Sequence, residues 1–89
     1  MTVSHSADEC PARSEARRIL YEVITDILPG VQLDEIDPSQ HLKDLGADSV
    51  DRVEIITIAV ERLGVRKPAS AFSATRDIST LLDRLAAAL

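Results

Sequence analysis

Residues 45–64, LGADSVDRVEIITIAVERLG, contain the strongest helix signals in the chain. Asp48 suits an N-cap, and Asp51, three residues later, suits the partner position of a capping box. Both carboxylates also favour the positive end of the helix dipole. Gly64 is typical of helix C-termini, where the backbone turns left-handed. The stretch therefore predicts a helix that is capped by Asp48 and runs through Leu63.

This predicted helix has two apolar faces, which become visible when it is unrolled at about 100° per residue. A small bundle buries one broad face of a helix, so we expect the second stripe to be an exposed docking strip for a partner. The other interpretation is contact with the preceding loop, or scattered surface residues. The inward face is Ile55, Ile56, Ile58, Ala59 and Leu63, and the second stripe is Val50, Val53, Thr57 and Val60, bordered by Glu54 and Glu61.

The rest of the chain predicts a small all-α bundle of three main helices plus a short third helix, with a long loop after the first. We expect residues 1–10 to be a flexible N-terminus and residues 11–89 to form one folded domain. The elements are a first helix from Pro11 or Ser14 to Leu28, a loop at 31–47, the helix after Asp48, a helical turn at 69–73 and a last helix at 78–88 capped by Asp77.

The composition restricts the possible partners. The formal net charge is −5, and residues 31–65 alone carry eight acids and three bases, which accounts for that whole value. Nucleic-acid binding needs a basic surface, so it is disfavoured. The natural partners of such an acidic surface are basic patches on other proteins.

Enzymatic and metal sites are not indicated. Neither His5 nor His41 has a nucleophile at a defensible spacing, and the Cys and His spacing of metal sites is absent. A single cysteine, Cys10, excludes an internal disulfide. The chain has no apolar run long enough for a membrane span and no signal-peptide pattern. We expect a cytoplasmic monomer that catalyses no reaction itself.

Ser49 is the best candidate for a modified residue. If Asp48 is the N-cap, Ser49 occupies the first helical position and its hydroxyl is not needed for capping. The hydroxyl is then expected to point outward at the junction between loop and helix. Backbone N–H groups at such a helix start favour a bound phosphate.

Residues 44–51, DLGADSVD, resemble the phosphopantetheine attachment motif of the acyl carrier protein family, with Val50 in place of the usual leucine. The similarity covers roughly residues 12–89, which would make residues 11–89 a carrier domain. It implies a four-helix carrier fold. It also implies that a phosphopantetheinyl transferase moves the 4'-phosphopantetheine arm of coenzyme A onto Ser49, and that the arm then holds acyl groups as thioesters.

The family similarity also assigns a docking role to the helix after Ser49. Enzymes that work on the carried group dock on this helix and on the loop before it. The expected docking residues are Asp48, Val50, Asp51, Arg52, Val53, Glu54, Thr57, Val60 and Glu61.

A narrower similarity is carried by residues 46–55, GADSVDRVEI, together with Pro68, Phe72, residues 76–78 and Leu81. This pattern resembles discrete donor carriers of polyketide β-branching cassettes. It implies an acetyl unit, made from malonyl, that is presented to an HMG-CoA-synthase-like enzyme. An acyltransferase and a decarboxylating ketosynthase-like enzyme are then further partners. The short length suits a free-standing protein, and an excised synthase domain is the other interpretation.

Other functions compete with the donor role. A fatty-acid carrier usually has a more acidic helix after the serine, whereas Arg52, Val60 and Arg62 dilute that charge here. A basic pair, residues 66–67, also replaces the usual acidic third-helix region. A peptidyl carrier tends to have Leu-Gly-Gly where residues 45–47 are Leu-Gly-Ala. A different class is a helical interaction domain in which Ser49 is only structural.

Overall fold

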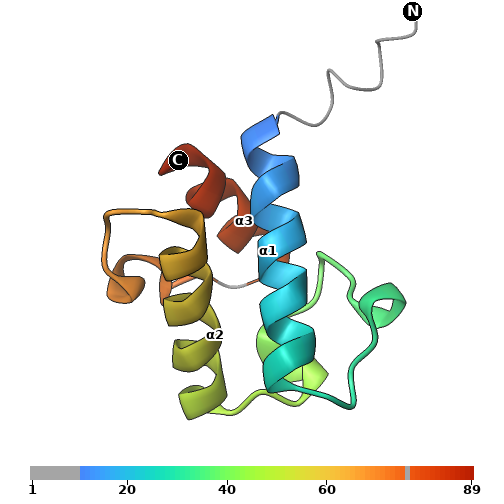
Figure 1. Ribbon diagram of the computed structural model, residues 1–89. Coiled ribbons are helices and arrows are strands. Elements are labelled where there is room, and N and C mark those ends of the chain that lie inside the picture. Colours follow the sequence, from blue (N-terminus) through green and yellow to red (C-terminus); the bar gives the residue numbers. More distant parts are fainter. Residues whose placement is uncertain (1–10, 76) are drawn as a thin grey trace, which may run out of the picture.

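The computed structural model describes residues 11–75 and 77–89, and the flexible N-terminus expected at residues 1–10 lies outside this part of the chain. Its elements are three α-helices and three short 3-10 turns, with no strand among the described residues (Figure 1). The all-α class with three main helices and a short helical turn is confirmed. In chain order the elements are α1 (Pro11–Ile27), η2 (Leu33–Glu35), η3 (Leu42–Leu45), α2 (Ser49–Leu63), η4 (Ala69–Phe72) and α3 (Ile78–Ala87).

Helix α1 is the central support, because it packs against both α2 and α3. Its core face repeats at helical spacing, and Ala16, Leu20, Val23 and Ile24 are fully buried. The helix begins at Pro11, so Ser14 lies inside it and is not its cap. Pro11 suits this place because the first helical residue has no use for a backbone N–H.

The long connection between α1 and α2 is held by buried anchors and by the start of α3. Ile36 and Leu42 are buried in the core. The carbonyl oxygens of Pro38 and Gln40 accept hydrogen bonds from the N–H groups of Ser79 (2.8 Å) and Ile78 (2.9 Å). These loop carbonyls satisfy N–H groups that would otherwise be unpaired at the start of α3. The loop is therefore part of the folded structure, and it places η3 beside α3.

The burial pattern of α2 corrects one expectation. Ile55, Ile56 and Ala59 are buried as predicted, but Val60 is also buried, with 8% of its surface exposed. The chain turns back at Gly64, whose φ of 71° is left-handed, and the N–H of Val65 donates to the carbonyl of Val60 (3.1 Å).

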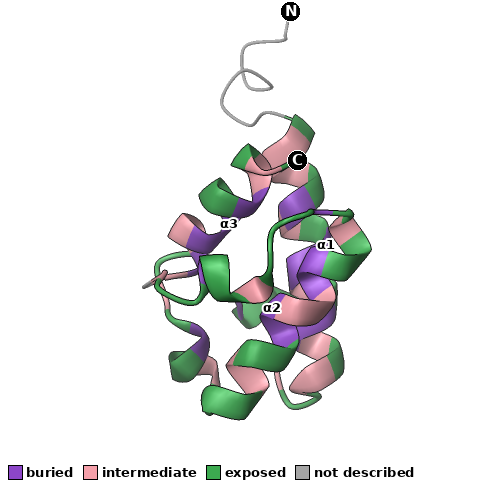
Figure 2. Cartoon of the chain, turned by 90° about the vertical axis from the view of Figure 1, so that its left-hand side faces the viewer, coloured by how far each residue is buried: buried purple, intermediate pink, exposed green. Residues whose placement is uncertain are grey.

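The segment that follows this turn covers the flank of α2. Val65 and Phe72, at the two ends of the returning segment, are both buried. Helix α2 also packs against η4. The prediction that Val60 is exposed was wrong, because the helical projection of α2 contains no information about the segment that returns over it. Figure 2 shows that the start of α2 is largely exposed.

A charge at Val60 is expected to destabilise the fold, whereas the same charge at Val53 is not. Val53 is 58% exposed on the same helix, which makes it a matched control. Val60→Glu should lower the free energy of unfolding by at least about 2 kcal/mol, because it buries an unpaired carboxylate. Val53→Glu should change it by less than about 0.5 kcal/mol. Urea denaturation measures both, and equal midpoints would contradict the burial of Val60.

Acid should weaken α3 through its cap. The Asp77 carboxylate accepts a hydrogen bond from the N–H of Thr80 (2.8 Å), and hydrogen bonding to Thr80 holds the pKa of Asp77 below its ordinary value of 3.8. A lowered folded-state pKa stabilises the fold above the unfolded pKa, and this contribution is lost as pH falls through the folded value.

The variant Asp77→Asn keeps a capping oxygen but does not titrate. Between about pH 5 and pH 2, the urea midpoint of the unsubstituted chain should therefore fall more than that of Asp77→Asn. Parallel midpoints over this range would show that the Asp77 carboxylate contributes nothing to the acid sensitivity.

Candidate functional site

Asp48 caps α2, and this leaves the hydroxyl of Ser49 available. The Asp48 side chain accepts from the N–H of Asp51 (2.8 Å), and the Asp51 side chain accepts from the N–H of Asp48 (3.4 Å). This reciprocal pair is the predicted capping box. Ser49 is exposed at the first residue of α2, and its hydroxyl makes no hydrogen bond within the described part of the chain.

The residues before Ser49 aim the chain into α2. Gly46 ends η3 with a φ of 100°, a left-handed conformation that strains any side chain. No atom lies near the place a Cβ would occupy, so the backbone conformation, and not crowding, favours glycine here. Ala47 is buried and its N–H donates to the carbonyl of Leu42 (3.2 Å). A rigid turn therefore delivers Ser49 to the helix start.

An exposed apolar surface extends from Ser49 along α2, and we call it the α2 strip. Val50 is 70% exposed and Val53 58% exposed, which is unusual for valines on a helix. Glu54 and Glu61 are also exposed, and neither forms an ion pair within the described residues. The strip is thus apolar with unpaired acids beside it. It consists of Ser49, Val50, Val53, Glu54, Thr57 and Ile58 around a shallow hollow, with Glu61 further along the helix.

The predicted docking residues divide between this strip and other places. Asp48, Val50, Val53, Glu54 and Glu61 are exposed, whereas Asp51 and Thr57 are half-buried. Val60 is buried under the returning segment. Arg52 is half-buried and lines a different hollow, toward η3 and α3.

Ile58 was missed as a strip residue. Sequence reasoning placed it on the inward face, but it is half-buried and lines the hollow of the α2 strip. Its position four residues after Glu54 and eight after Val50 puts it near both on a helix surface. This spacing is the signal that could have assigned it to the strip.

Two of the bases on α1 and α2, Arg18 and Arg62, pair with acids of α1. Arg62 lies 3.4 Å from the Asp26 carboxylate and 4.0 Å from that of Glu22. Arg18 pairs with Glu15 (2.6 Å) and Glu22 (3.2 Å). Arg62 was expected to dilute the acidity of α2, but its charge is compensated by α1 instead. The negative charge of the acids beside the α2 strip is therefore not neutralised by Arg62, and it can attract a basic partner.

Residues 11–75 and 77–89 contain no group of three His, Cys, Asp or Glu side chains that could hold a metal ion. None of the helices in this part of the chain has the length and apolarity needed to cross a membrane.

Comparisons with known proteins agree on one family. The profile of the family described as "Phosphopantetheine attachment site" matches residues 18–85. The sequence is 37% identical to the "Polyketide biosynthesis acyl-carrier-protein AcpK" of Bacillus subtilis (strain 168) over 67 residues. This alignment covers 75% of the present chain and 82% of the Bacillus subtilis protein. Over 67 residues it is 33% identical to the "Non-reducing polyketide synthase adrD" of Penicillium roqueforti, of which it covers 3%. No solved structure matches significantly.

The site fits the prosthetic group of this family. A phosphodiester needs an accessible hydroxyl, and Ser49 offers one that makes no hydrogen bond to residues 11–75 or 77–89. The N–H groups at the start of α2 favour the phosphate, although Asp48 and Asp51 occupy two of them. When bound, the group supplies a thiol that holds an acyl unit as a thioester. The chain belongs to the phosphopantetheine-binding carrier family, and it is a non-catalytic carrier, related to polyketide acyl carriers, that is modified with 4'-phosphopantetheine.

Proposed function

We propose that the phosphopantetheine arm is attached to Ser49 and that the chain serves as an acetyl and malonyl donor for β-branching in polyketide biosynthesis. The observation that carries the attachment site is the hydroxyl at the first residue of α2, which is exposed and has no hydrogen-bond partner in the described part of the chain. In the transfer, the Ser49 oxygen forms a bond to the phosphorus next to the pantetheine of coenzyme A. The pyrophosphate bond breaks, adenosine 3',5'-bisphosphate leaves, and the serine proton passes to the transferase.

The α2 strip is the proposed docking surface for the enzymes that act on the arm. It begins at the attachment residue, so a docked enzyme lies beside the arm. Its exposed valines supply an apolar centre, and Glu54 and Glu61 supply negative charge that no described residue pairs with. An apolar centre with a charged rim is the usual organisation of a protein interface. A partner with a complementary basic rim would associate faster and in a defined orientation.

The donor role is supported by sequence similarity. Residues 46–55 resemble discrete donor carriers, and the matched Bacillus subtilis protein is named for polyketide biosynthesis. The proposed partners are a phosphopantetheinyl transferase, an acyltransferase, a decarboxylating ketosynthase-like enzyme and an HMG-CoA-synthase-like enzyme. The carrier would accept malonyl from the acyltransferase. The ketosynthase-like enzyme would remove carbon dioxide from the malonyl group, and the carrier would then present acetyl to the HMG-CoA-synthase-like enzyme.

Ser49→Ala should abolish attachment of the arm. The purified chain is incubated with coenzyme A and a broad-specificity transferase, and its intact mass is measured. We expect the unsubstituted chain to gain one phosphopantetheinyl group and Ser49→Ala to gain none. Ser70→Ala is the matched control, because Ser70 is an exposed serine of η4, and it should be modified normally. Modification of Ser49→Ala would sink the assignment.

Val53→Glu should slow acetyl transfer to an HMG-CoA-synthase-like enzyme by about tenfold or more, because docking would bury the new charge in an apolar contact. Leu33→Glu is the matched control, since Leu33 is 57% exposed on η2, away from the strip, and Val53 is 58% exposed. The acetyl-loaded carrier and both variants are compared by the rate of loss of the acetyl group.

Equal rates for Val53→Glu and Leu33→Glu would argue against the α2 strip as the docking surface. Reaction of the acetyl-loaded carrier with fatty-acid condensing enzymes, and not with the β-branching enzyme, would refute the donor role. That result would leave the attachment at Ser49 intact.

A further inference from the structure

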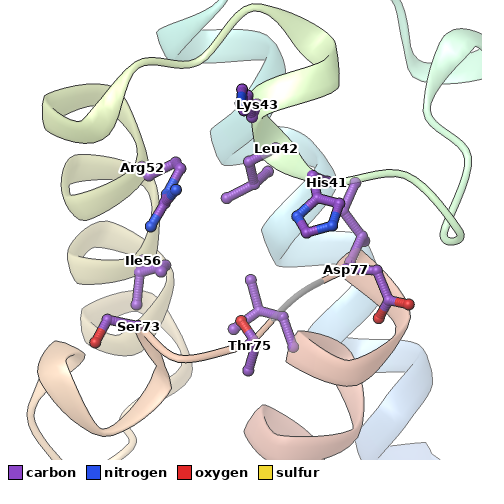
Figure 3. A pocket seen from close by; sticks show the side chains of 10 residues that line it. His41, Leu42, Lys43, Arg52, Ile56, Ser73, Thr75 and Asp77 are labelled. Atoms are coloured by element: carbon purple, nitrogen blue, oxygen red, sulfur yellow. The ribbon is translucent and has the colours of Figure 1, made fainter.

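A small hollow lies between η3, α2 and the start of α3, away from the α2 strip. Its volume is about 30 Å³. Figure 3 shows Arg52 on α2 and His41 on the opposite side of the hollow, and Lys43 of η3 also lines it. Polar side chains from the segment before α3 complete the wall. The polar and charged lining consists of His41, Lys43, Arg52, Ser73, Thr75 and Asp77.

Arg52 occupies a place where α2 otherwise carries apolar residues. Ile56 and Ala59, four and seven residues further on, share its face of the helix and are buried. Arg52 is half-buried, and its guanidinium makes no hydrogen bond or ion pair within the described residues. By contrast Arg13, also half-buried, pairs with Asp83 at 2.8 Å. A half-buried guanidinium with unused donors favours an anion.

The charges around the hollow leave room for one added anion. The Asp77 carboxylate accepts the N–H of Thr80 and is turned toward α3 (Figure 3). It interacts electrostatically with His41. Lys43 has no ion-pair partner within the described residues, so Arg52 and Lys43 are two uncompensated cations. In a chain of net charge −5, such a pair beside a hollow is a local exception.

The hydroxyl groups of the lining are already used as donors. Ser73 donates to the carbonyl of Ser70 (3.0 Å), and Thr75 donates to that of Phe72 (2.9 Å). The side-chain donors left for an anion are therefore Arg52, Lys43 and the imidazole N–H of His41.

The size of the hollow selects the kind of anion. One water needs about 10–15 Å³ of space for its centre, so the 30 Å³ of this hollow corresponds to two or three waters. This space suits a carboxylate group and is too small for an acyl chain. A planar carboxylate also matches the fork of donors on a guanidinium.

We propose that this hollow binds a carboxylate, and that its source is the end of a malonyl unit on the arm of Ser49. The inference rests on the proposed function. Ser49 precedes Arg52 by three residues, about 4.5 Å along the helix axis, which the arm easily spans. Malonyl has a free carboxylate and acetyl has none. The carrier itself would then hold the malonyl form and leave the acetyl form free for its acceptor enzyme.

The test compares malonyl-loaded and acetyl-loaded carrier by amide NMR. Malonyl loading should shift the resonances of His41 and Thr75, and acetyl loading should not. Arg52→Gln should reduce the malonyl-specific shift by about fivefold or more, whereas Arg52→Lys should restore part of it. Arg66→Gln is the matched control, because Arg66 is exposed, unpaired within the described residues and outside the hollow. Equal urea midpoints would show that all three variants are folded.

A titration with free malonate tests this proposal separately from the attachment of the arm. Free malonate is added to the unmodified chain, and Arg52→Gln should weaken its binding by about tenfold, the loss expected for one charge-assisted contact. This measurement needs no arm, so it stays informative if Ser49 is not modified. Equal shifts with acetyl and malonyl cargo would place the phosphodiester in the hollow and overturn the proposal. Shifts that are independent of Arg52 would also overturn it.

Discussion

The reciprocal hydrogen bonds between Asp48 and Asp51 determine where α2 begins, and the rest of the site depends on that position. The backbone of Asp48 is extended, and the helix starts at the next residue. Ser49 is therefore the first residue of a helix whose cap is already provided. If Ser49 were itself the cap, its oxygen would be engaged with a backbone N–H. Because Asp48 takes this role, the hydroxyl remains exposed and makes no hydrogen bond to the residues that the structure describes.

A second constraint is the small size of the domain. A chain of 89 residues buries little surface, so the connections between its helices also contribute to the core. The loop before α2 contributes Ile36 and Leu42, and the segment after it contributes Val65 and Phe72. The loop also supplies carbonyl acceptors to the start of α3. The two connections flanking α2 therefore determine which of its faces remain exposed.

The sequence predicted the helices well because their ends carry strong local signals. The cap at Asp48 and the left-handed Gly64 bound α2 as expected, and the cap at Asp77 starts α3. These signals act within one turn of the helix, so neighbouring residues suffice to identify them. The exposed hydroxyl of Ser49 follows from the same local geometry.

The errors concern residues whose environment is set by distant segments. Val60 lies on the predicted outer stripe, but it is covered by a segment that returns after Gly64. Arg52 lines another hollow and shares its helix face with Ile56 and Ala59, so its environment also depends on distant segments, and its docking role stays a prediction. Periodicity predicts which residues share a face of a helix. It cannot predict which part of that face another segment will cover.

Helix α2 thus presents three different surfaces to three different environments. Its core face packs on α1, the strip after Ser49 faces solvent, and Arg52 faces the hollow by η3. The charges follow the same division, since Arg62 is compensated by acids of α1 while Glu54 and Glu61 are unpaired within the described residues. The positive charge of Arg62, one turn after Ile58, is thereby compensated beside the exposed strip. A helix that combined these charges on one face would lose the acidic character that a basic partner needs.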